Sequence, residues 1–281
     1  MGTANYCCPQ AKPLAVTKTI TSRDNPTVKA LRALAADPRE SRRQGRTLID
    51  GPHLVAAYRQ QCGEPEMLVV SESVGDNDEV GRLLAESSTT EALRLPDSLF
   101  RELSGVATPV GILAVIKIPE APSGPVGGSC VVLDAVQDAG NVGAILRTAA
   151  AAGLGDIVLG PGCAGAWTPR VLRAAQGAHF SLRIREQADL ATMLRGYGGI
   201  SVATVARDGR PLYELDVSGA VAWIFGNEGS GLDEVLTSQA THRATIPLAA
   251  ETESLNVAAA AAICLFEGVR QRNSKMGKQD V

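Results

Sequence analysis

The stretch LDAVQDAGNVGAILRTA at residues 133–149 joins the end of an apolar strand, a polar loop with glycines and the start of a helix. On either side of it, short apolar runs alternate with helical patterns, at residues 130–133, 156–159, 201–205, 221–225 and 244–247. Such continuously apolar runs are typical of parallel strands covered on both faces. The sequence therefore predicts an α/β domain with a parallel sheet, closed by a helix from Ser254 to about Arg272.

Two further strand ends carry unusual polar and glycine-rich sequence. They are IFGNEGSGL at residues 224–232, and IPL at 246–248, which leads to ESLNV at 253–257. Ligands of parallel α/β sheets bind at the carboxyl ends of the strands, so the three loops predict one site. None of them contains G-x-G-x-x-G, which disfavours a dinucleotide-binding oxidoreductase.

A linker divides the chain. Residues 120–128 (EAPSGPVGG) have no apolar periodicity and are rich in Pro, Gly and Ser. We expect a small α/β domain over residues 12–119, the parallel-sheet domain over 129–273 and a polar tail over 274–281. The small domain opens with a helix from Pro26, followed by a helix at 51–61, a helix at 99–103, and strands at 47–49, 67–70 and 112–116.

Composition excludes several classes of protein. The chain has 281 residues, 45% of them hydrophobic. Its longest apolar run, at residues 257–266, is well short of the ~18 residues that span a bilayer. The first residues lack a charged segment followed by an apolar one, so we do not expect secretion. The six cysteines form no CxxC, and none is separated from a histidine by the spacing typical of metal ligands. We therefore expect reduced thiols, no metal and a cytoplasmic protein.

Charge is distributed unevenly. The net charge is −3, yet the first 60 residues hold ten basic and four acidic side chains, a net +6. This asymmetry indicates either contact with a polyanion or a solvated helix face.

The three loops together resemble the motifs of the SPOUT-class RNA ribose 2′-O-methyltransferases of the SpoU or TrmH branch. N-x-G-x-x-x-R is present at residues 141–147, G-N-E-x-x-G-L at 226–232, and I-P at 246–247 followed by S-L-N-V at 254–257. In the first domain, SRDNP (22–26), DGPH (50–53) and TPVGI (108–112) resemble an L30e-like substrate-binding module. Ala139 and Asp50 depart from the family pattern, which has Pro and Glu at those positions.

The resemblance implies a C-terminal domain with a deep trefoil knot and a homodimer with its site at or near the interface. It implies methyl transfer from S-adenosylmethionine to a ribose 2′-hydroxyl of structured RNA, with ribosomal RNA favoured over transfer RNA and no DNA or membrane partner. A catalytically silent RNA-binding or ribosome-assembly protein on the same scaffold is the alternative.

Five residues are predicted to carry catalysis, each with a plainer alternative. The resemblance makes Arg147 the catalytic arginine, against an ordinary helix-surface arginine. Asn141 either supports it or caps its helix. Glu228 is either a buried orienting acid or a solvent-facing turn acid. Ser254 and Asn256 either orient the hydroxyl or cap the last helix. An arginine stays protonated near neutral pH, so a phosphate oxygen or water is an alternative proton acceptor.

Binding residues complete the prediction. Cofactor contacts are expected from Gly226, Ile246, Leu255, Asn256 and, at the end of its strand, Thr204. RNA contacts are expected from Arg39, Arg42, Arg43, Arg46 and Arg173. We predict that His179 is a packed neutral histidine, with a general base as the alternative.

Overall fold

The computed structural model describes residues 18–75, 77–86, 90–249 and 252–276. Most of the predicted polar tail, residues 277–281, and the first residues of the predicted small domain, 12–17, lie outside this part. The chain divides into two compact units, Met1–Lys117 and Ile118–Val281.

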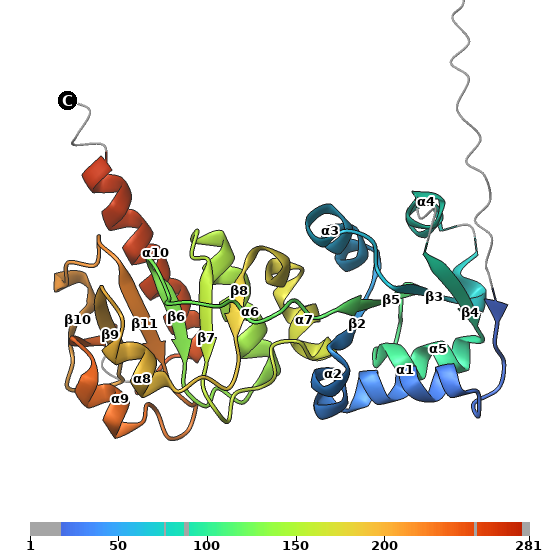
Figure 1. The fold of residues 1–281 in the computed structure, drawn as a ribbon. Helices are drawn as coiled ribbons and strands as arrows, with labels where there is room; N and C mark the ends of the chain where they lie inside the picture. The colour runs from blue at the N-terminus through green and yellow to red at the C-terminus, as the bar shows by residue number, and fades with distance from the viewer. Residues whose placement is uncertain (1–17, 76, 87–89, 250–251, 277–281) are drawn as a thin grey trace, which may run out of the picture. The chain divides into compact units, whose positions relative to one another are not determined.

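A five-stranded sheet forms the centre of the first unit (Figure 1), in the order β1-β4-β3-β5-β2. β1, β4 and β3 are mutually parallel, whereas β5 runs antiparallel to its neighbours β3 and β2. The strands are β1 (Lys18–Thr19), β2 (Arg46–Asp50), β3 (Met67–Ser71), β4 (Glu91–Leu95) and β5 (Ile112–Lys117).

Helices cover both faces of this sheet. α1 (Pro26–Ala36) and α5 (Asp97–Ser104) bury Leu31 and Phe100 in one core cluster with alternate strand residues. α3 (Pro52–Cys62) and α4 (Asp78–Glu86) bury Val55 and Val80, and α3 contacts β2 and β5. α2 (Pro38–Gln44) connects α1 to β2. α4 and β4 were not predicted from the sequence, because α4 contains Gly81 and β4 carries the exposed, charged Glu91 and Arg94 among its five residues.

The second unit holds a seven-stranded, wholly parallel sheet in the order β10-β12-β9-β11-β6-β7-β8. Its core strands confirm the predicted parallel α/β class. The strands are β6 (Cys130–Leu133), β7 (Asp156–Leu159), β8 (Arg183–Arg185), β9 (Ile200–Thr204), β10 (Arg210–Pro211), β11 (Val221–Phe225) and β12 (His242–Thr245).

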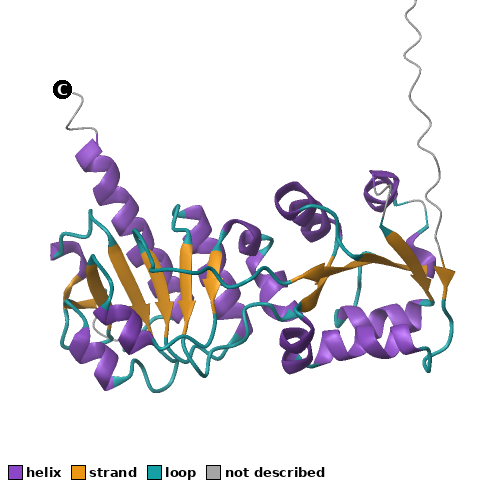
Figure 2. Cartoon of the chain, viewed as in Figure 1, coloured by secondary structure: helices purple, strands orange, loops and turns teal. Residues whose placement is uncertain are grey.

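Helices cover both faces of this sheet too (Figure 2). Leu194 of α8 (Leu190–Arg195) and Leu236 of α9 (Glu234–Gln239) pack with Val132 and Ile224 on one face. On the other face α10 (Val257–Met276) contacts β11 and α6 (Ala139–Ala151), and α6 also contacts α7 (Pro169–Ala175). Residues 120–128, expected as a linker, belong to this unit, where Tyr197 Oη donates to the Gly128 carbonyl over 2.5 Å.

The last helix differs from the prediction at both ends. It begins at Val257 instead of Ser254, because Asn256 Oδ1 accepts from the N–H groups of Ala258 and Ala259 and caps it. It continues to Met276, so residues 274–276 of the predicted tail are helical.

The strand order places β12 between β9 and β10, which are consecutive in the chain. The segment that leaves β12 therefore starts beside the loop joining β9 to β10. A Cβ on Gly209 of that loop would lie 2.9 Å from the Ala244 carbonyl carbon, so this crossing requires glycine. The trefoil knot implied by the resemblance is compatible with this order and stays a prediction.

Candidate functional site

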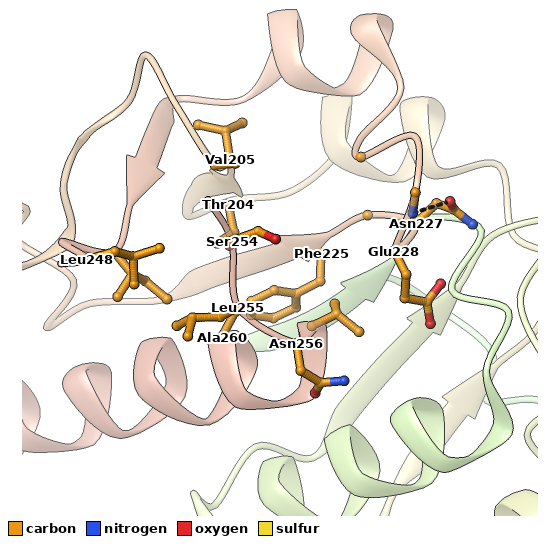
Figure 3. Close-up of a pocket in the computed structure, with 16 residues that line it drawn as sticks. Thr204, Val205, Phe225, Asn227, Glu228, Leu248, Ser254, Leu255, Asn256 and Ala260 are labelled. Atoms are coloured by element: carbon orange, nitrogen blue, oxygen red, sulfur yellow. Dashed lines mark hydrogen bonds between the residues drawn. The ribbon is translucent and has the colours of Figure 1, made fainter. Parts of the chain in front are cut away.

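A cavity of about 490 Å³ opens at the carboxyl ends of β9 and β11. Figure 3 shows that its side chains come from these two strand ends and from the segment that leads into α10. The walls combine apolar side chains with polar ones, and they include Thr204, Val205, Phe225, Gly226, Asn227, Glu228, Ile246, Leu248, Ser254, Leu255 and Asn256.

All five predicted cofactor residues line this cavity, namely Gly226, Ile246, Leu255, Asn256 and Thr204. The Thr204 hydroxyl is buried and has no hydrogen-bond partner in the described part of the chain, although the Cys264 thiol lies close to it. A buried hydroxyl without a partner is costly, and a ligand in the cavity could supply one.

The loop after β11 folds back on itself. The backbone N–H and C=O groups of Asn227 pair with those of Gly231. A Cβ on Gly226 would lie 2.5 Å from Gly231 backbone atoms, so no other residue fits there without movement. This turn presents Glu228 and Gly229 at the cavity wall.

A chain of hydrogen bonds joins the three sequence motifs. Asn141 Nδ2 donates to Glu228 Oε1 over 3.0 Å, and Asn256 Nδ2 donates to Asn141 Oδ1 over 2.9 Å. Both polar atoms of the Asn141 amide are therefore engaged, one by each of the other motifs.

Glu228 is held by the loop after β6 as well. It accepts from the N–H groups of Gln137 and Asp138 over 3.4 and 3.3 Å. Desolvation raises the pKa of Glu228, but these bonds and the one from Asn141 outweigh it, so its pKa lies below the usual value. In the single chain Glu228 is an exposed carboxylate in a turn, and it also orients Asn141 through their hydrogen bond.

Asn141 does not cap its helix. The N-cap of α6 is Asp138, whose Oδ1 accepts from the Asn141 N–H over 2.8 Å, and Asn141 lies in the first turn. The alternative that Asn141 caps the helix is therefore wrong, because α6 begins two residues earlier, at Ala139.

Arg147 lies in the third turn of α6, further from its start than expected. Its side chain is exposed and makes no ion pair within the described part of the chain, and it is absent from the cavity wall. The structure thus brings Asn141, Glu228, Ser254 and Asn256 to the cavity or its rim, but leaves Arg147 on the helix surface.

Gly143 of the first motif has a packing role. A Cβ on it would lie 2.4 Å from the Ala174 Cβ and 2.8 Å from the Val171 carbonyl oxygen. The glycine therefore allows α6 and α7 to pack closely, next to the turn that carries Arg147.

His179 is the packed histidine that was predicted. It is 1% exposed, its Nε2 lies 2.7 Å from the Ala166 carbonyl oxygen, and its ring contacts Trp167. Burial lowers the pKa of His179 to about 4, so the ring is neutral near pH 7. Arg173 lies half-buried on α7, one turn from the exposed Arg170.

The basic residues of the first unit fall into two groups. Arg43 pairs with Glu40 over 2.5 Å and Arg46 with Glu66 over 2.6 Å. Arg39 and Arg42 are exposed on α2 and form no ion pair with the described residues. The remaining motifs of this unit lie away from α2, at the other end of the strands. Residues 50–53 and 108–112 lie together there because β5 starts where β2 ends, and residues 22–26 follow the end of β1.

Two polar residues of the site were missed. Asp138 was not predicted because Asn141 seemed the better helix cap. Asn227 was not predicted because only the glycines and Glu228 of its loop were considered as functional residues. Asn227 could have been singled out, since it is the one amide in a turn otherwise made of small residues and an acid.

Across the described residues, no helix is both long and apolar enough to cross a membrane. The same part of the chain contains no group of three or more His, Cys, Asp or Glu side chains that could hold a metal ion.

Comparison with known proteins gives two family matches. Residues 128–266 match the SpoU rRNA Methylase family, and residues 25–114 match the MRM3-like substrate binding domain.

Individual proteins resemble nearly the whole chain. The 23S rRNA (guanosine(2553)-2′-O)-methyltransferase RlmP of Bacillus subtilis (strain 168) is 33% identical, over 89% of this chain and 98% of its own. A tRNA/rRNA methyltransferase named as uncharacterized, slr1673 of Synechocystis, is 32% identical over 90% of this chain and 94% of its own. The solved structure of an rRNA methyltransferase from Sinorhizobium meliloti, bound to S-adenosylmethionine (AdoMet), has a TM-score of 0.78 at 28% identity. It covers 90% of this chain and 97% of its own.

Proposed function

The chain belongs to the SpoU rRNA methylase family, and we propose that the cavity at β9, β11 and α10 carries out that family's reaction. The reaction transfers a methyl group from S-adenosylmethionine to a ribose 2′-hydroxyl of RNA. The observation that carries this assignment is the hydrogen-bond chain Glu228–Asn141–Asn256, which joins the three family motifs at the cavity rim. The complete set of motif residues disfavours the catalytically silent alternative.

The residues present fit S-adenosylmethionine. Its adenine can lie against the apolar walls formed by Leu255, Ile246 and Phe225, and the unpartnered Thr204 hydroxyl offers a hydrogen bond. Gly226 and Gly229 let the backbone approach closely. Bound there, the cofactor supplies a sulfonium-activated methyl group.

The protein's own work is to position the hydroxyl and accept its proton. We assign Arg147 to hold the target phosphate, since a guanidinium binds phosphate oxygens bidentately. Since a guanidinium is a poor base, we assign the proton to a phosphate oxygen or a water held by it. Ser254 and Asn256, exposed at the cavity, orient the sugar.

We further propose a homodimer whose interface includes the exposed side of α10. Phe266 on that helix is 49% exposed, and Ala259, seven residues earlier, is exposed on the same side. Arg147, on the neighbouring α6, lies outside the cavity wall of its own chain. A site completed at an interface accounts for both features. Light scattering of the wild type and of a Phe266→Glu variant tests this, with a dimeric variant counting against the surface.

Ribosomal RNA is the substrate that the relatives support, and it agrees with a cytoplasmic protein. We assign RNA docking to the first unit, where Arg39 and Arg42 are free to bind phosphates. Ribose-methylation mapping of total RNA, from cells with and without the protein, tests the function. One ribosomal nucleotide should lose its 2′-O-methyl group when the protein is removed, and should regain it with the wild type but not with Arg147→Ala. An unchanged methylation map refutes the proposal.

A further inference from the structure

The side chain of Asn227, the second residue of the motif at 226–232, joins two loops of the site and has not yet been assigned a role in the reaction. Asn227 Nδ2, in the loop after β11, donates to the Ala135 carbonyl in the loop after β6 over 2.8 Å. Its Oδ1 accepts from the N–H groups of Gly229 and Ser230 over 2.8 and 3.0 Å. The amide thus closes its own turn with one atom and holds the neighbouring loop with the other.

The residue that accepts the Asn227 hydrogen bond, Ala135, has a strained backbone. Ala135 has a φ of 52°, in the left-handed region that residues with a Cβ seldom adopt. Such a conformation persists only where the surroundings hold it. Here Asn227 binds its carbonyl, and Gly162 leaves space, since a Cβ there would lie 3.2 Å from the Ala135 Cβ.

The held loop supports Glu228. Gln137 and Asp138, two and three residues beyond Ala135, donate their N–H groups to the Glu228 carboxylate. Asn227, which immediately precedes Glu228, therefore sets the spacing between this carboxylate and its donors. A second hydrogen bond joins the same two loops, from the Asp233 N–H to Asp134 Oδ2 over 2.9 Å.

We propose that Asn227 is a positioning residue for methyl transfer. It holds Ala135 of the loop after β6 in its left-handed conformation, so that Glu228 can bind the start of α6 and orient Asn141. This inference rests on the proposed roles of Glu228 and Asn141 in the reaction.

The variant Asn227→Asp tests the hydrogen bond to Ala135 by itself. It keeps the acceptor for Gly229 and Ser230, so the turn stays closed, but it replaces the donor to Ala135 with an oxygen. We expect kcat on RNA to fall by about 10- to 100-fold, the usual cost of losing an orienting partner. The Kd for S-adenosylmethionine, measured by calorimetry, should stay within about threefold of the wild-type value because the turn at the cavity is preserved.

Ser230→Ala is the matched control. It removes only the 3.3 Å contact between the Ser230 hydroxyl and Asn227 Oδ1, so its kcat should equal that of the wild type. An Asn227→Asp variant with wild-type kcat overturns the proposal. The proposal is also overturned if the loss of kcat follows the unfolded fraction or the loss of cofactor affinity. An inactive wild type would instead refute the proposed function.

Discussion

Asn256 and Asn141 are 115 residues apart in the chain, and their side-chain amides are joined by a 2.9 Å hydrogen bond. Each stands in the first turn or at the cap of its helix, so the bond fixes the starts of α10 and α6 side by side. At the far ends of the same helices Arg272 reaches the Ala152 carbonyl. The two helices therefore run parallel, and they bring the first and third motifs together.

Replacing Asn141 with Asp should separate catalysis from cofactor binding. The change keeps the acceptor for Asn256 but places a carboxylate oxygen where Nδ2 donates to Glu228. Like charges so close repel, so the loop bearing Glu228 should shift. We expect kcat to fall by at least about 10-fold. Calorimetric affinity for S-adenosylmethionine should fall less than kcat, because Asn141 itself does not line the cavity, whereas the shifted loop does. A variant with normal kcat would contradict the role of this contact.

Arg147→Ala should abolish methyl transfer, since no other side chain is assigned to the target phosphate. Folding and cofactor affinity should persist, because the arginine is exposed and lies outside the cavity wall. Arg147→Lys keeps the charge without the bidentate geometry and should recover little activity. Methyl incorporation into RNA measures the effect, and Arg195→Ala, an exposed arginine on α8, is the control that should stay active. Full activity of Arg147→Ala removes it from the mechanism.

Gly143→Ala should destabilise the second unit. The added methyl group would lie 2.4 Å from the Ala174 Cβ, so α6 and α7 must move apart at a cost of about 1–3 kcal/mol. Both tryptophans, Trp167 and Trp223, belong to the second unit, so fluorescence in urea reports its unfolding alone. Gly198→Ala, where no atom lies within 4 Å of the added Cβ, should leave the midpoint nearly unchanged. Equal midpoints for the two variants would show that the helices tolerate the methyl group.

Local sequence was sufficient for elements with a strong pattern and insufficient for contacts between distant segments. β6, β7 and β11 have the predicted bounds because their apolar runs are continuous and buried on both faces. β8 and β10 have two or three residues, too few to show a period. For Asn141 the choice between a helix cap and a site residue stayed open, because its partners, Glu228 and Asn256, are 87 and 115 residues away. The position of Arg147 outside the cavity depends on how α6 rotates against α7, which no periodicity reveals.

The buried His179 should make stability depend on pH. Its folded pKa is about 4, below the ordinary 6.5, so between these values the unfolded chain binds the extra proton. The contribution of the neutral ring to the free energy of unfolding is therefore complete above pH 6.5. It is lost as the pH falls toward 4, which lowers the free energy of unfolding by about 3 kcal/mol in total. The free energy of unfolding from urea titrations at pH 7.5 and 5.5 measures this. His179→Gln should flatten the pH slope, whereas replacing the exposed His53 should not. Equal slopes for wild type and His179→Gln would contradict the assignment.

The two free arginines of α2 should contribute to RNA affinity in a salt-dependent way. Each phosphate contact releases counterions, so it adds roughly 0.7–0.9 to the slope of log K against log salt concentration. Replacing both Arg39 and Arg42 with Ala should therefore lower the slope by roughly 1.5 and weaken binding to ribosomal RNA, with kcat at saturating RNA unchanged. Arg82→Ala, at an exposed arginine on α4, is the matched control, and it should keep the wild-type slope. Arg43 and Arg46 should matter less, because Glu40 and Glu66 already neutralise them.

Should the double variant keep the full slope, α2 is not a phosphate-binding surface. The surface where β2 ends and β5 begins, with residues 50–53 and 108–112, would then be the next one to change, because it carries two of the remaining motifs of this unit.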